Sequence, residues 1–500
     1  MIGVTEQTTG CPQMRRSIAF EGIIDTLQWV IIALILALIF RAFVMEAFRI
    51  PTGSMAETLR GAHLHLRCPR CGYKYDAGAD TPPKPQCPSC GYLLPPGTVV
   101  SISNGDRVLV LKSIYQFCVP KRWDVVVFKN PLDPTTNYIK RMIAGPDETV
   151  EIIDGDIYIN GQIARKPANV QQELWMPVYD NDYPAIGIQE SFAKGLGQGV
   201  DEEEVPEAGR QQPFRNDQGS RWDLNANGPT VFALDSDPKQ VNTIFYDTSI
   251  GNDFRATYGY NSSIEYDFRP VCSDLMVRFY VVPGGSQGFI GIGLAKHGKL
   301  FIGSVDFSGA MTIEEAVDGR TVRLEHQEMG PVDTDKPVML QFANVDHQLI
   351  LEFGPEKIKH DLGCGPDDAG EGNRRRPPAV EILGAGKVTL SHIGVYRDIY
   401  YISEGILRAQ EGNGFRVGKD EFFVCGDNSP SSMDCRLWED EGVGNNGVKY
   451  TAGTVPRDYL VGKAVLVYWS DAFKPFENLL PIIPNFGQIR FISGGSNKEL

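Results

Sequence analysis

The stretch N-Y-I-K-R-M-I, residues 137–143, has the pattern of a β-strand with a charged residue near its centre. Because side chains alternate across a strand, we expect Tyr138, Lys140 and Met142 on one face. A lysine among apolar neighbours loses hydration, and burial lowers the pKa of a lysine toward neutrality. The run therefore predicts a strand that carries an uncharged amine able to accept a proton.

Short β-type runs separated by turn signals surround this strand. Between residues 99 and 163 they are R-V-L-V-L, D-V-V-V-F, T-V-E-I-I and D-I-Y-I-N-G, with Gly, Asn, Asp and Pro pairs between them. They predict an antiparallel β domain. A second series, from Asp274 to Ile402, recurs at about 10-residue spacing and favours a β-sandwich. Between the two series, residues 195–227 have the composition of a loop or linker.

A tight turn precedes the first of these runs. In F-R-I-P-T-G-S-M, residues 48–55, Pro51 and Gly53 favour an exposed turn that presents Ser54. A turn serine usually does no more than hydrogen-bond the backbone. With Lys140 as a neutral base, Ser54 becomes a candidate nucleophile, and no Ser-His-Asp arrangement is needed.

A third segment, G-D-N-S-P-S-S-M-D-C-R at residues 426–436, is dense in turn formers and ionisable groups. Ser432 is a candidate hydrogen-bond partner for the lysine amine, and Asp434 and Arg436 are candidates for a structural ion pair. Taken alone, a loop of this kind is more often plain structure.

Together these segments resemble the bacterial type I signal peptidases. The resemblance rests on several motifs that occur in the family's order after one apolar segment, which is more specific than any single motif. They are P-T-G-S-M at 51–55, N-G-D-R-V-L-V-L-K at 104–112, K-R-W-D-V-V-V-F at 121–128, N-Y-I-K-R at 137–141, G-D-N-S-P-S-S-M-D-C-R at 426–436 and G-K-A-V-L-V-Y-W-S at 462–470.

The resemblance implies a Ser-Lys dyad serine endopeptidase that removes signal peptides from exported preproteins through an acyl-enzyme. Ser54 would be the nucleophile and Lys140 the general base. The backbone N–H of Ser54 and the hydroxyl of Thr52 would stabilise the oxyanion. No catalytic cofactor is implied. The residues expected to support the dyad are Ser432, Asp434, Arg436, Asp427 and Asn428.

The substrate would be a preprotein signal peptide with small residues before the cut. It would bind extended along a sheet edge, so that backbone hydrogen bonds give affinity and shallow pockets select small side chains. Ile50 and Ile143 are the candidates for lining those pockets.

The chain departs from the family pattern at a few positions. Thr52 replaces a common serine and keeps the hydroxyl, Glu57 stands where proline is common, and A-G-P-D-E at 144–148 follows the usual pattern loosely. Cys435 also replaces a common serine. None of these changes removes a catalytic group.

An apolar segment precedes the nucleophile turn. Residues 23–40 follow Arg15 and Arg16, and eighteen residues at ~1.5 Å each give roughly 27 Å, near the thickness of a bilayer core. A cleaved signal peptide is the alternative, but residues 41–46 offer no small-x-small cleavage site, so we favour a retained anchor. The flanking charges leave its orientation open. The resemblance implies a single-pass protein of the cytoplasmic (inner) membrane with an extracytoplasmic catalytic domain.

Four cysteines form two near-identical knuckles, C-P-R-C-G-Y at 68–73 and C-P-S-C-G-Y at 87–92. The C-x₂-C-x₁₅-C-x₂-C spacing suits a tetrahedral structural zinc, and a pair of disulfides is the alternative. The predicted ligands are Cys68, Cys71, Cys87 and Cys90. We interpret the neighbouring His63 and His65 as surface residues. Cys272 and Cys364 could form a disulfide in an oxidising compartment.

The segment 190–402 occupies the place where the family often carries an accessory β domain, and its strand rhythm looks like a concanavalin-type jelly roll. Such domains often bind glycans, so a glycan or protein ligand and a purely structural role both stay open. The net charge of −15 argues against a nucleic-acid partner, because phosphate binding needs clustered Lys and Arg.

The predicted fold class is mainly β, with an N-terminal transmembrane helix, a signal-peptidase-type antiparallel β catalytic domain, an inserted zinc ribbon and an inserted jelly-roll-like sandwich. The predicted segments are 1–22 (cytoplasmic tail), 23–46 (anchor), 47–67, 99–189 and 403–500 (catalytic domain), 68–98 (zinc ribbon) and 190–402 (linker and sandwich). Two alternatives are a self-cleaving Ser-Lys protein of the repressor type, which would lack an anchor, and a catalytically idle surface protein that binds through its sandwich.

Overall fold

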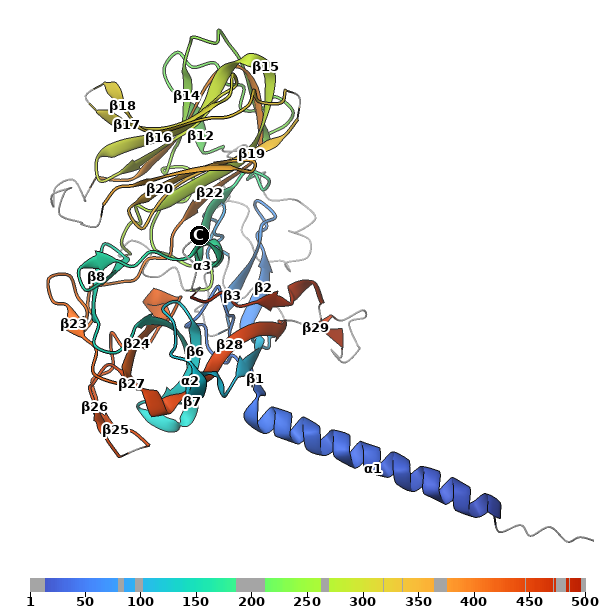
Figure 1. Cartoon of the computed structure of the whole chain (residues 1–500). Helices are drawn as coiled ribbons and strands as arrows, with labels where there is room; N and C mark the ends of the chain where they lie inside the picture. Colours follow the sequence, from blue (N-terminus) through green and yellow to red (C-terminus); the bar gives the residue numbers. More distant parts are fainter. Residues whose placement is uncertain are drawn as a thin grey trace, which may run out of the picture.

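The computed structural model describes residues 14–79, 85–94, 102–185, 212–261, 269–317, 319–334, 336–363, 376–445, 447–470, 472–473, 483–484 and 486–495. Strands dominate this part of the chain, as the short β-type runs predict. Figure 1 shows one β body stacked on another, with helix α1 (Met14–Phe43) projecting from the lower one.

The lower body is built on an eight-stranded antiparallel sheet whose strands come from both ends of the chain. The strand order is β1-β5-β28-β6-β7-β24-β27, and β31 pairs with β28. The strands are β1 (Met45–Arg49), β5 (Arg107–Leu111), β6 (Val125–Asn130), β7 (Asp133–Ala144), β24 (Glu421–Cys425), β27 (Val455–Pro456), β28 (Leu460–Trp469) and β31 (Arg490–Phe491). Because β28 lies between β5 and β6, the sheet needs both ends of the chain.

Strand β6 explains why D-V-V-V-F is apolar at every position. Val125 and Val127 belong to one hydrophobic cluster, whereas Val126 and Phe128 belong to another. Successive side chains point to opposite faces of a strand, so this sheet is covered on both faces.

A four-stranded sheet contributes to the second of these clusters. Its order is β10-β9-β8-β23, and Val150 and Ile152 of β8 share a cluster with Phe128. The strands are β8 (Thr149–Ile153), β9 (Asp156–Ile159), β10 (Gln162–Ile163) and β23 (Phe415–Arg416). The runs T-V-E-I-I and D-I-Y-I coincide with β8 and β9.

A small three-stranded sheet carries the cysteine knuckles. Strand β2 (His63–Arg67) lies between β3 (Lys74–Gly78) and β4 (Ile102–Ser103). Its own hydrophobic cluster includes Leu66, Tyr75 and the knuckle cysteines.

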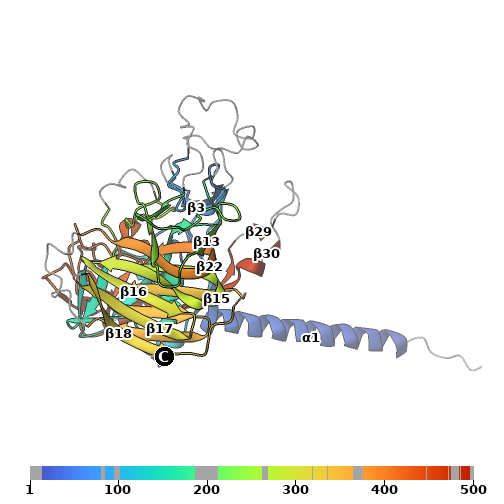
Figure 2. The ribbon, with the colours of Figure 1, turned by 90° about the horizontal axis from the view of Figure 1, so that it is seen from above.

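The upper body is a sandwich of two facing layers (Figures 1 and 2). The ring of Phe342 in β19 lies so close to Gly303 in β16 that a Cβ on the glycine would come within 2.5 Å of it, which shows how tightly the layers pack. The strands are β11 (Met176–Asp180), β12 (Phe214–Asn216), β13 (Val231–Asp235), β14 (Asn242–Tyr246), β15 (Leu275–Lys296), β16 (Lys299–Asp306), β17 (Ala310–Val317), β18 (Arg320–Glu328), β19 (Val338–Val345), β20 (Gln348–Phe353), β21 (Glu356–Asp361) and β22 (Ala379–Arg397).

Two long strands tie the layers together. Strand β15 pairs with β22 along most of its length, with β19 in its first half and with β16 in its second half. The runs L-M-V-R-F-Y-V-V at 275–282 and G-F-I-G-I-G-L at 288–294 predict two strands where β15 is one. The register shift between Pro283 and Gly288 marks an irregularity that bends the strand without ending it.

The sandwich begins earlier in the chain than residue 190. Strand β11 pairs with β22, so residues 176–180 belong to the sandwich sheet, and not to the catalytic segment 99–189 in which the sequence analysis placed them. Its pairing partner is more than two hundred residues away in the chain, and a short strand alone carries no sign of that partner.

Buried charges fill the joint between the two bodies. Lys166 lies between Asp346 and Asp398 of the sandwich side, and Lys296 pairs with Asp274. Each of these side chains is at most 6% exposed. Ion pairs with so little exposure need close partners to offset lost hydration, so they favour one seating of the sandwich.

Short elements complete the described fold. They are helices α2 (Ile114–Phe117) and α3 (Ala168–Leu174), the 3₁₀ turns η4 (Ser429–Ser431), η5 (Arg457–Tyr459) and η6 (Phe486–Gln488), and the hairpins β25 (Gly442–Val443) with β26 (Lys449–Tyr450) and β29 (Ala472–Phe473) with β30 (Ile483–Pro484).

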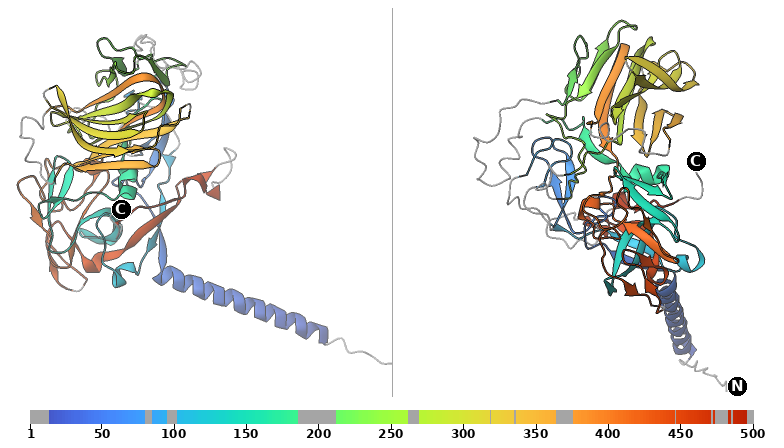
Figure 3. Two further views of the ribbon diagram at one scale, coloured as in Figure 1. Left: turned by 45° about the horizontal axis from the view of Figure 1, so that its top comes forward. Right: turned by 90° about the vertical axis from the view of Figure 1, so that its left-hand side faces the viewer.

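Helix α1 stands apart from both bodies (Figure 3). Its apolar side chains from Leu27 to Phe40 are exposed. Within the residues whose side chains the structure describes, which in α1 are 25–41 and 43, no helix is both long and apolar enough to cross a membrane.

Candidate active site and cysteine cluster

The turn after β1 presents Ser54 at the surface of the catalytic sheet. Ile50 is buried and its N–H donates to the carbonyl of Asp106, which holds the start of the turn against the sheet. The N–H of Ala56 donates to the carbonyl of Gly53, and Met55 is fully buried. The turn is anchored on both sides, so Ser54 has a fixed place between two core residues.

Lys140 of β7 reaches this serine from a distant part of the chain. Its Nζ lies 2.7 Å from the Oγ of Ser54 and also donates to its neighbour's carbonyl, that of Ile139, at 3.2 Å. The amine lies 5.3 Å from the ring centre of Tyr138, which confirms that Tyr138 and Lys140 share a face. A nucleophile and its base within hydrogen-bond reach are what proton transfer requires.

The environment of Lys140 favours the neutral amine. The residue is 4% exposed. Burial lowers the pKa of Lys140 to about 8, and the nearby Arg436 guanidinium also lowers it. The carboxylates of Asp434 and Asp427 oppose this shift without reversing it.

Two buried ion pairs flank the lysine. The Arg141 guanidinium donates from Nε and from a terminal nitrogen to the two oxygens of Asp427, both at 2.7 Å. Arg436 holds Asp434 in the same two-point manner, at 2.9 and 2.8 Å, as the sequence predicts. All four side chains are at most 1% exposed. Such planar two-point pairs fix geometry as well as charge.

Arg141 stands next to Lys140 in the quoted motif, but nothing in the local sequence marks it as a site residue. An arginine one position from a buried lysine points to the other side of the strand, and only its partner in the distant loop explains it. Asp427 is expected from the sequence to support the dyad. In the structure its carboxylate forms an ion pair with Arg141 and not with Lys140.

Ser432 lies in the site but has another surrounding than expected. Its hydroxyl is buried and helps to lower the pKa of the Asp434 carboxyl, and among the described residues no hydrogen bond joins it to the Lys140 amine. A Cβ built on Gly426 would come within 2.2 Å of the Ser432 Oγ and 2.4 Å of the Ser54 carbonyl oxygen. Only a glycine at residue 426 lets these two segments approach each other.

Asn428 joins the loop to the nucleophile turn. Its backbone N–H donates to the Ser54 carbonyl at 3.1 Å, and its side-chain amide donates to the Gly53 carbonyl at 3.0 Å. The sandwich side of the chain contributes a partner that sequence reasoning missed, because Asn261 and Asn428 exchange two amide hydrogen bonds of 2.7 Å. Nothing in the local sequence at Asn261 signals this contact.

The remaining predicted site residues lie around this centre. Thr52 is exposed two residues before Ser54. Ile50 and Ile143 are 2% and 0% exposed and belong to different hydrophobic clusters, so the structure does not bring them together.

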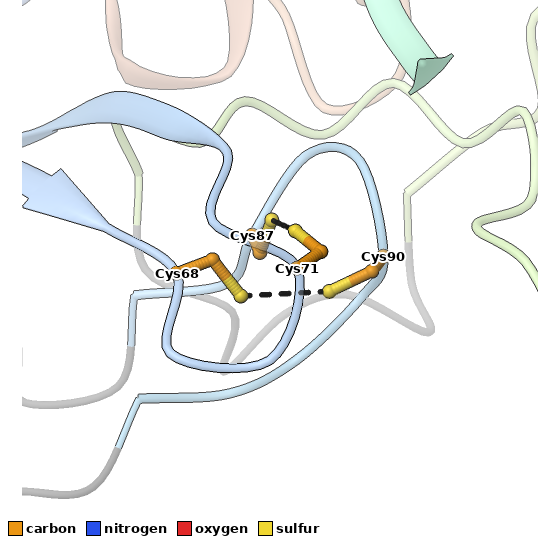
Figure 4. Close-up of side chains that lie close together, drawn as sticks. All are labelled: Cys68, Cys71, Cys87 and Cys90. Carbon is orange, nitrogen blue, oxygen red and sulfur yellow. Dashed lines mark hydrogen bonds between the residues drawn. The ribbon is translucent and has the colours of Figure 1, made fainter. Parts of the chain in front are cut away.

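The four knuckle cysteines converge as the spacing predicts (Figure 4). The Sγ atoms of Cys68 and Cys90 are 3.5 Å apart and those of Cys71 and Cys87 are 3.7 Å apart, and all four lie within 4.8 Å of one another. Four thiolates around a zinc ion at about 2.3 Å would be separated by about 3.8 Å, whereas a disulfide needs about 2.05 Å. The arrangement fits the metal.

The backbone of the knuckles repeats with the sequence. In each knuckle the N–H of the glycine donates to the carbonyl of the first cysteine, and Gly72 and Gly91 have φ of +80° and +71°, a region that favours glycine. The proposed disulfide partner Cys364 lies outside the described residues, and Cys272 is a buried free thiol.

Part of this chain is similar to known proteins. Residues 98–207 and 400–469 match the family model described as signal peptidase, peptidase S26. The chain is 31% identical to the protein named signal peptidase I of Rickettsia canadensis (strain McKiel) over 125 residues, which are 25% of this chain and 38% of that protein. It is 31% identical over 133 residues, 26% of this chain, to the signal peptidase I of Rickettsia bellii (strain OSU 85-389). The chain thus spans about 38% of the length of these curated relatives.

Some solved structures show a low-level likeness over part of the chain. A carbohydrate binding module, CBM66 from Bacillus subtilis, has a TM-score of 0.25 and 10% identity over 37% of this chain and 96% of its own. The galectin LEC-6 of Caenorhabditis elegans has a TM-score of 0.19 and 14% identity over 25% of this chain and 83% of its own.

Replacing Lys140 with methionine should stabilise the protein near neutral pH. Because folding lowers the pKa of Lys140 from 10.5 to about 8, the folded state disfavours the charged form. The penalty is full below about pH 8 and disappears above about pH 10.5, which corresponds to about 3 kcal/mol of free energy of unfolding. Urea unfolding of the wild type and Lys140→Met, at about pH 7 and about pH 10, should show an advantage for the variant that shrinks at the higher pH. An advantage that grows with pH would contradict the buried neutral amine.

Proposed function

Because the chain belongs to the signal peptidase family peptidase S26 through residues 98–207 and 400–469, we propose that it is a serine endopeptidase that removes signal peptides from exported preproteins. The single observation that carries the mechanism is the 2.7 Å contact between the Lys140 amine and the Ser54 hydroxyl. It joins a nucleophile turn outside the matched residues to a buried base inside them.

In the proposed reaction the neutral amine of Lys140 takes the proton of the Ser54 hydroxyl as Oγ attacks the scissile carbonyl. The resulting tetrahedral oxyanion collapses, the peptide C–N bond breaks, and the lysine ammonium gives its proton to the leaving amine. A water then attacks the acyl-enzyme carbonyl while Lys140 accepts its proton, the ester bond to Ser54 breaks, and Lys140 returns the proton to the Ser54 Oγ. The released products are the signal peptide and the mature protein.

Oxyanion stabilisation would come from donors on the nucleophile turn. The Ser54 N–H and the Thr52 hydroxyl are the proposed donors, and the loss of one such donor typically costs about 3 kcal/mol of transition-state stabilisation. The two-point ion pairs of Arg141 and Arg436 hold the surrounding chain, so that the donors need no reorganisation during reaction.

Small residues before the cut would be selected by shallow pockets, but Ile50 and Ile143 are buried in separate clusters and would not line one pocket together. The substrate would lie extended against an edge of the sheet. A glycan or protein ligand of the sandwich stays open, and the concanavalin-type interpretation of the sandwich stays a prediction.

We propose a structural zinc at the cysteine cluster, with Cys68, Cys71, Cys87 and Cys90 as ligands. The distances between their sulfurs support it. The ion would cross-link two knuckles whose hydrophobic cluster is small. Catalysis would need no cofactor.

We also propose that α1 anchors the enzyme in the cytoplasmic membrane, with the catalytic body on the extracytoplasmic face. Its exposed apolar side chains, among them Trp29 at 71% and Leu36 at 60%, find no partner surface on the described body and would be covered by lipid. Exported preproteins, the proposed substrates, would reach the enzyme at this same membrane.

Ser54→Ala and Lys140→Ala should each abolish cleavage of a model preprotein, because nucleophile and base act as a unit. Both purified variants should remain folded, as circular dichroism would show, and Ser431→Ala, a serine of the 426–436 loop with no assigned role, is the matched control. Near-normal turnover by either dyad variant would refute the mechanism.

The cleavage rate should rise with pH through about 8, since only neutral Lys140 can accept the serine proton. The measurement is kcat/KM between about pH 6 and pH 10. A flat profile would assign the proton to another base.

The purified protein should contain about one zinc equivalent, and its four knuckle thiols should react with an alkylating reagent only after chelation or unfolding. Elemental analysis of protein prepared without metal-affinity resin, together with mass spectrometry for disulfides, is the measurement. Absent metal with the four cysteines linked in pairs would refute the zinc site.

The full chain should stay with membranes during alkaline carbonate extraction, whereas a variant that lacks residues 1–43 should be released. Protease added to intact spheroplasts should digest the body that follows α1. Release of the full chain by carbonate would refute the anchor.

A further inference from the structure

We propose that Asn261, which belongs to the sandwich insert, is a positioning residue of the candidate active site. Through Asn428 it would hold the Gly53–Ser54 peptide so that the Ser54 N–H points toward the reacting carbonyl. The proposal rests on the proposed protease function and adds to it that the insert completes the site. We call residues 254–261, which follow β14, the clamp loop.

A relay of hydrogen bonds links Asn261 to the nucleophile turn. Asn428 donates one amide hydrogen to the Asn261 oxygen and the other to the Gly53 carbonyl, and its own oxygen accepts from Asn261. A carboxamide presents two donors on one side and an acceptor on the other. The Gly53 carbonyl accepts only from a donor, so the Asn428 nitrogen faces it, and the two bonds to Asn261 hold the plane of that amide in place.

The Gly53 carbonyl controls the donor that the mechanism needs. It belongs to the same peptide group as the Ser54 N–H, and in a planar trans peptide the C=O and N–H point in opposite directions. A hydrogen bond that fixes the Gly53 oxygen therefore fixes the direction of the Ser54 N–H. The bond from the Asn428 N–H to the Ser54 carbonyl holds the next peptide in the same way.

Packing of the clamp loop adds a second restraint on the turn. A Cβ on Gly53 would lie 2.1 Å from the Tyr260 ring, so the ring covers the backbone directly. The Tyr260 hydroxyl donates to the carbonyl of Ala62 beyond the turn, and the Tyr258 hydroxyl donates to the carbonyl of Asp427. The loop thus contacts both segments that meet at the dyad.

The sandwich in turn fixes the clamp loop. Arg397, the last residue of β22, is 2% exposed, lies 5.1 Å from the Tyr258 ring centre and donates to the Thr257 carbonyl. Since β22 is a central strand of the sandwich, the position of Asn261 depends on the folded insert. We infer that the insert is a working part of the catalytic site.

Asn261→Ala should lower kcat about tenfold and leave KM within about twofold, because the oxyanion donor acts in the transition state and not in substrate binding. The midpoint of the pH profile should stay at the wild-type value, since Lys140 is untouched. Asn428→Ala should lower kcat at least as much. The double variant should be no worse than Asn428→Ala alone, because the effect of Asn261 passes through Asn428.

Asn216→Ala is the matched control, since Asn216 also makes two amide hydrogen bonds, both with Trp222, but inside the sandwich. It should lower the melting temperature without lowering kcat. Asn261→Ser, whose side chain is too short to bond both Asn428 atoms, should repeat the kcat loss and serves if the alanine variant does not fold.

Ser54→Ala in the same assay separates the two proposals. If Ser54→Ala still cleaves, the protease mechanism is wrong. If Ser54→Ala is inactive while Asn261→Ala and Asn261→Ser keep wild-type kcat, or if the losses of Asn261→Ala and Asn428→Ala multiply in the double variant, the positioning role is overturned and the protease proposal stands.

Discussion

The contact between a buried lysine amine and a serine hydroxyl is the constraint on which the rest of this structure depends. Lys140 must lose its hydration to become a useful base at moderate pH, and it must do so beside charged neighbours. The fold meets both needs by pairing those neighbours with each other. Arg141 pairs with Asp427 and Arg436 with Asp434, and the remaining pull of these carboxylates on the lysine proton does not reverse the effect of burial.

Three chain segments meet at this contact, and close backbone approach makes the meeting possible. The turn that carries Ser54, strand β7 and the loop 426–436 are far apart in sequence, and Gly426 lies where any side chain would separate them. Because β28 and β24 pair with the early strands, the long insert is accommodated as a loop between paired ends. The entropic cost of such a loop grows only slowly with its length.

The insert nevertheless does more than fill a loop. Buried ion pairs such as Lys166 with Asp346 seat the sandwich on the catalytic body, and the clamp loop reaches from it to the nucleophile turn. The position of the sandwich and the position of the clamp loop are coupled, because a shift of about an ångström at the joint would move Asn261 away from Asn428. In an arrangement of this kind the geometry of the dyad depends on how the sandwich is seated.

The sequence by itself determined the features that depend on local spacing. Alternation along β7 put Tyr138 and Lys140 on one face. Two residues between cysteines predicted the paired knuckles, and the spacing of two positions predicted the ion pair of Asp434 with Arg436.

Tertiary structure alone decided the features whose partners are distant. Arg141 pairs with Asp427 across 286 residues, and Asn261 pairs with Asn428 across 167. Strand β11 joins a sheet completed by β22, and β15 stays one strand through its bend. Periodicity records which way a side chain points, but the group it meets is set by the packing of the whole chain.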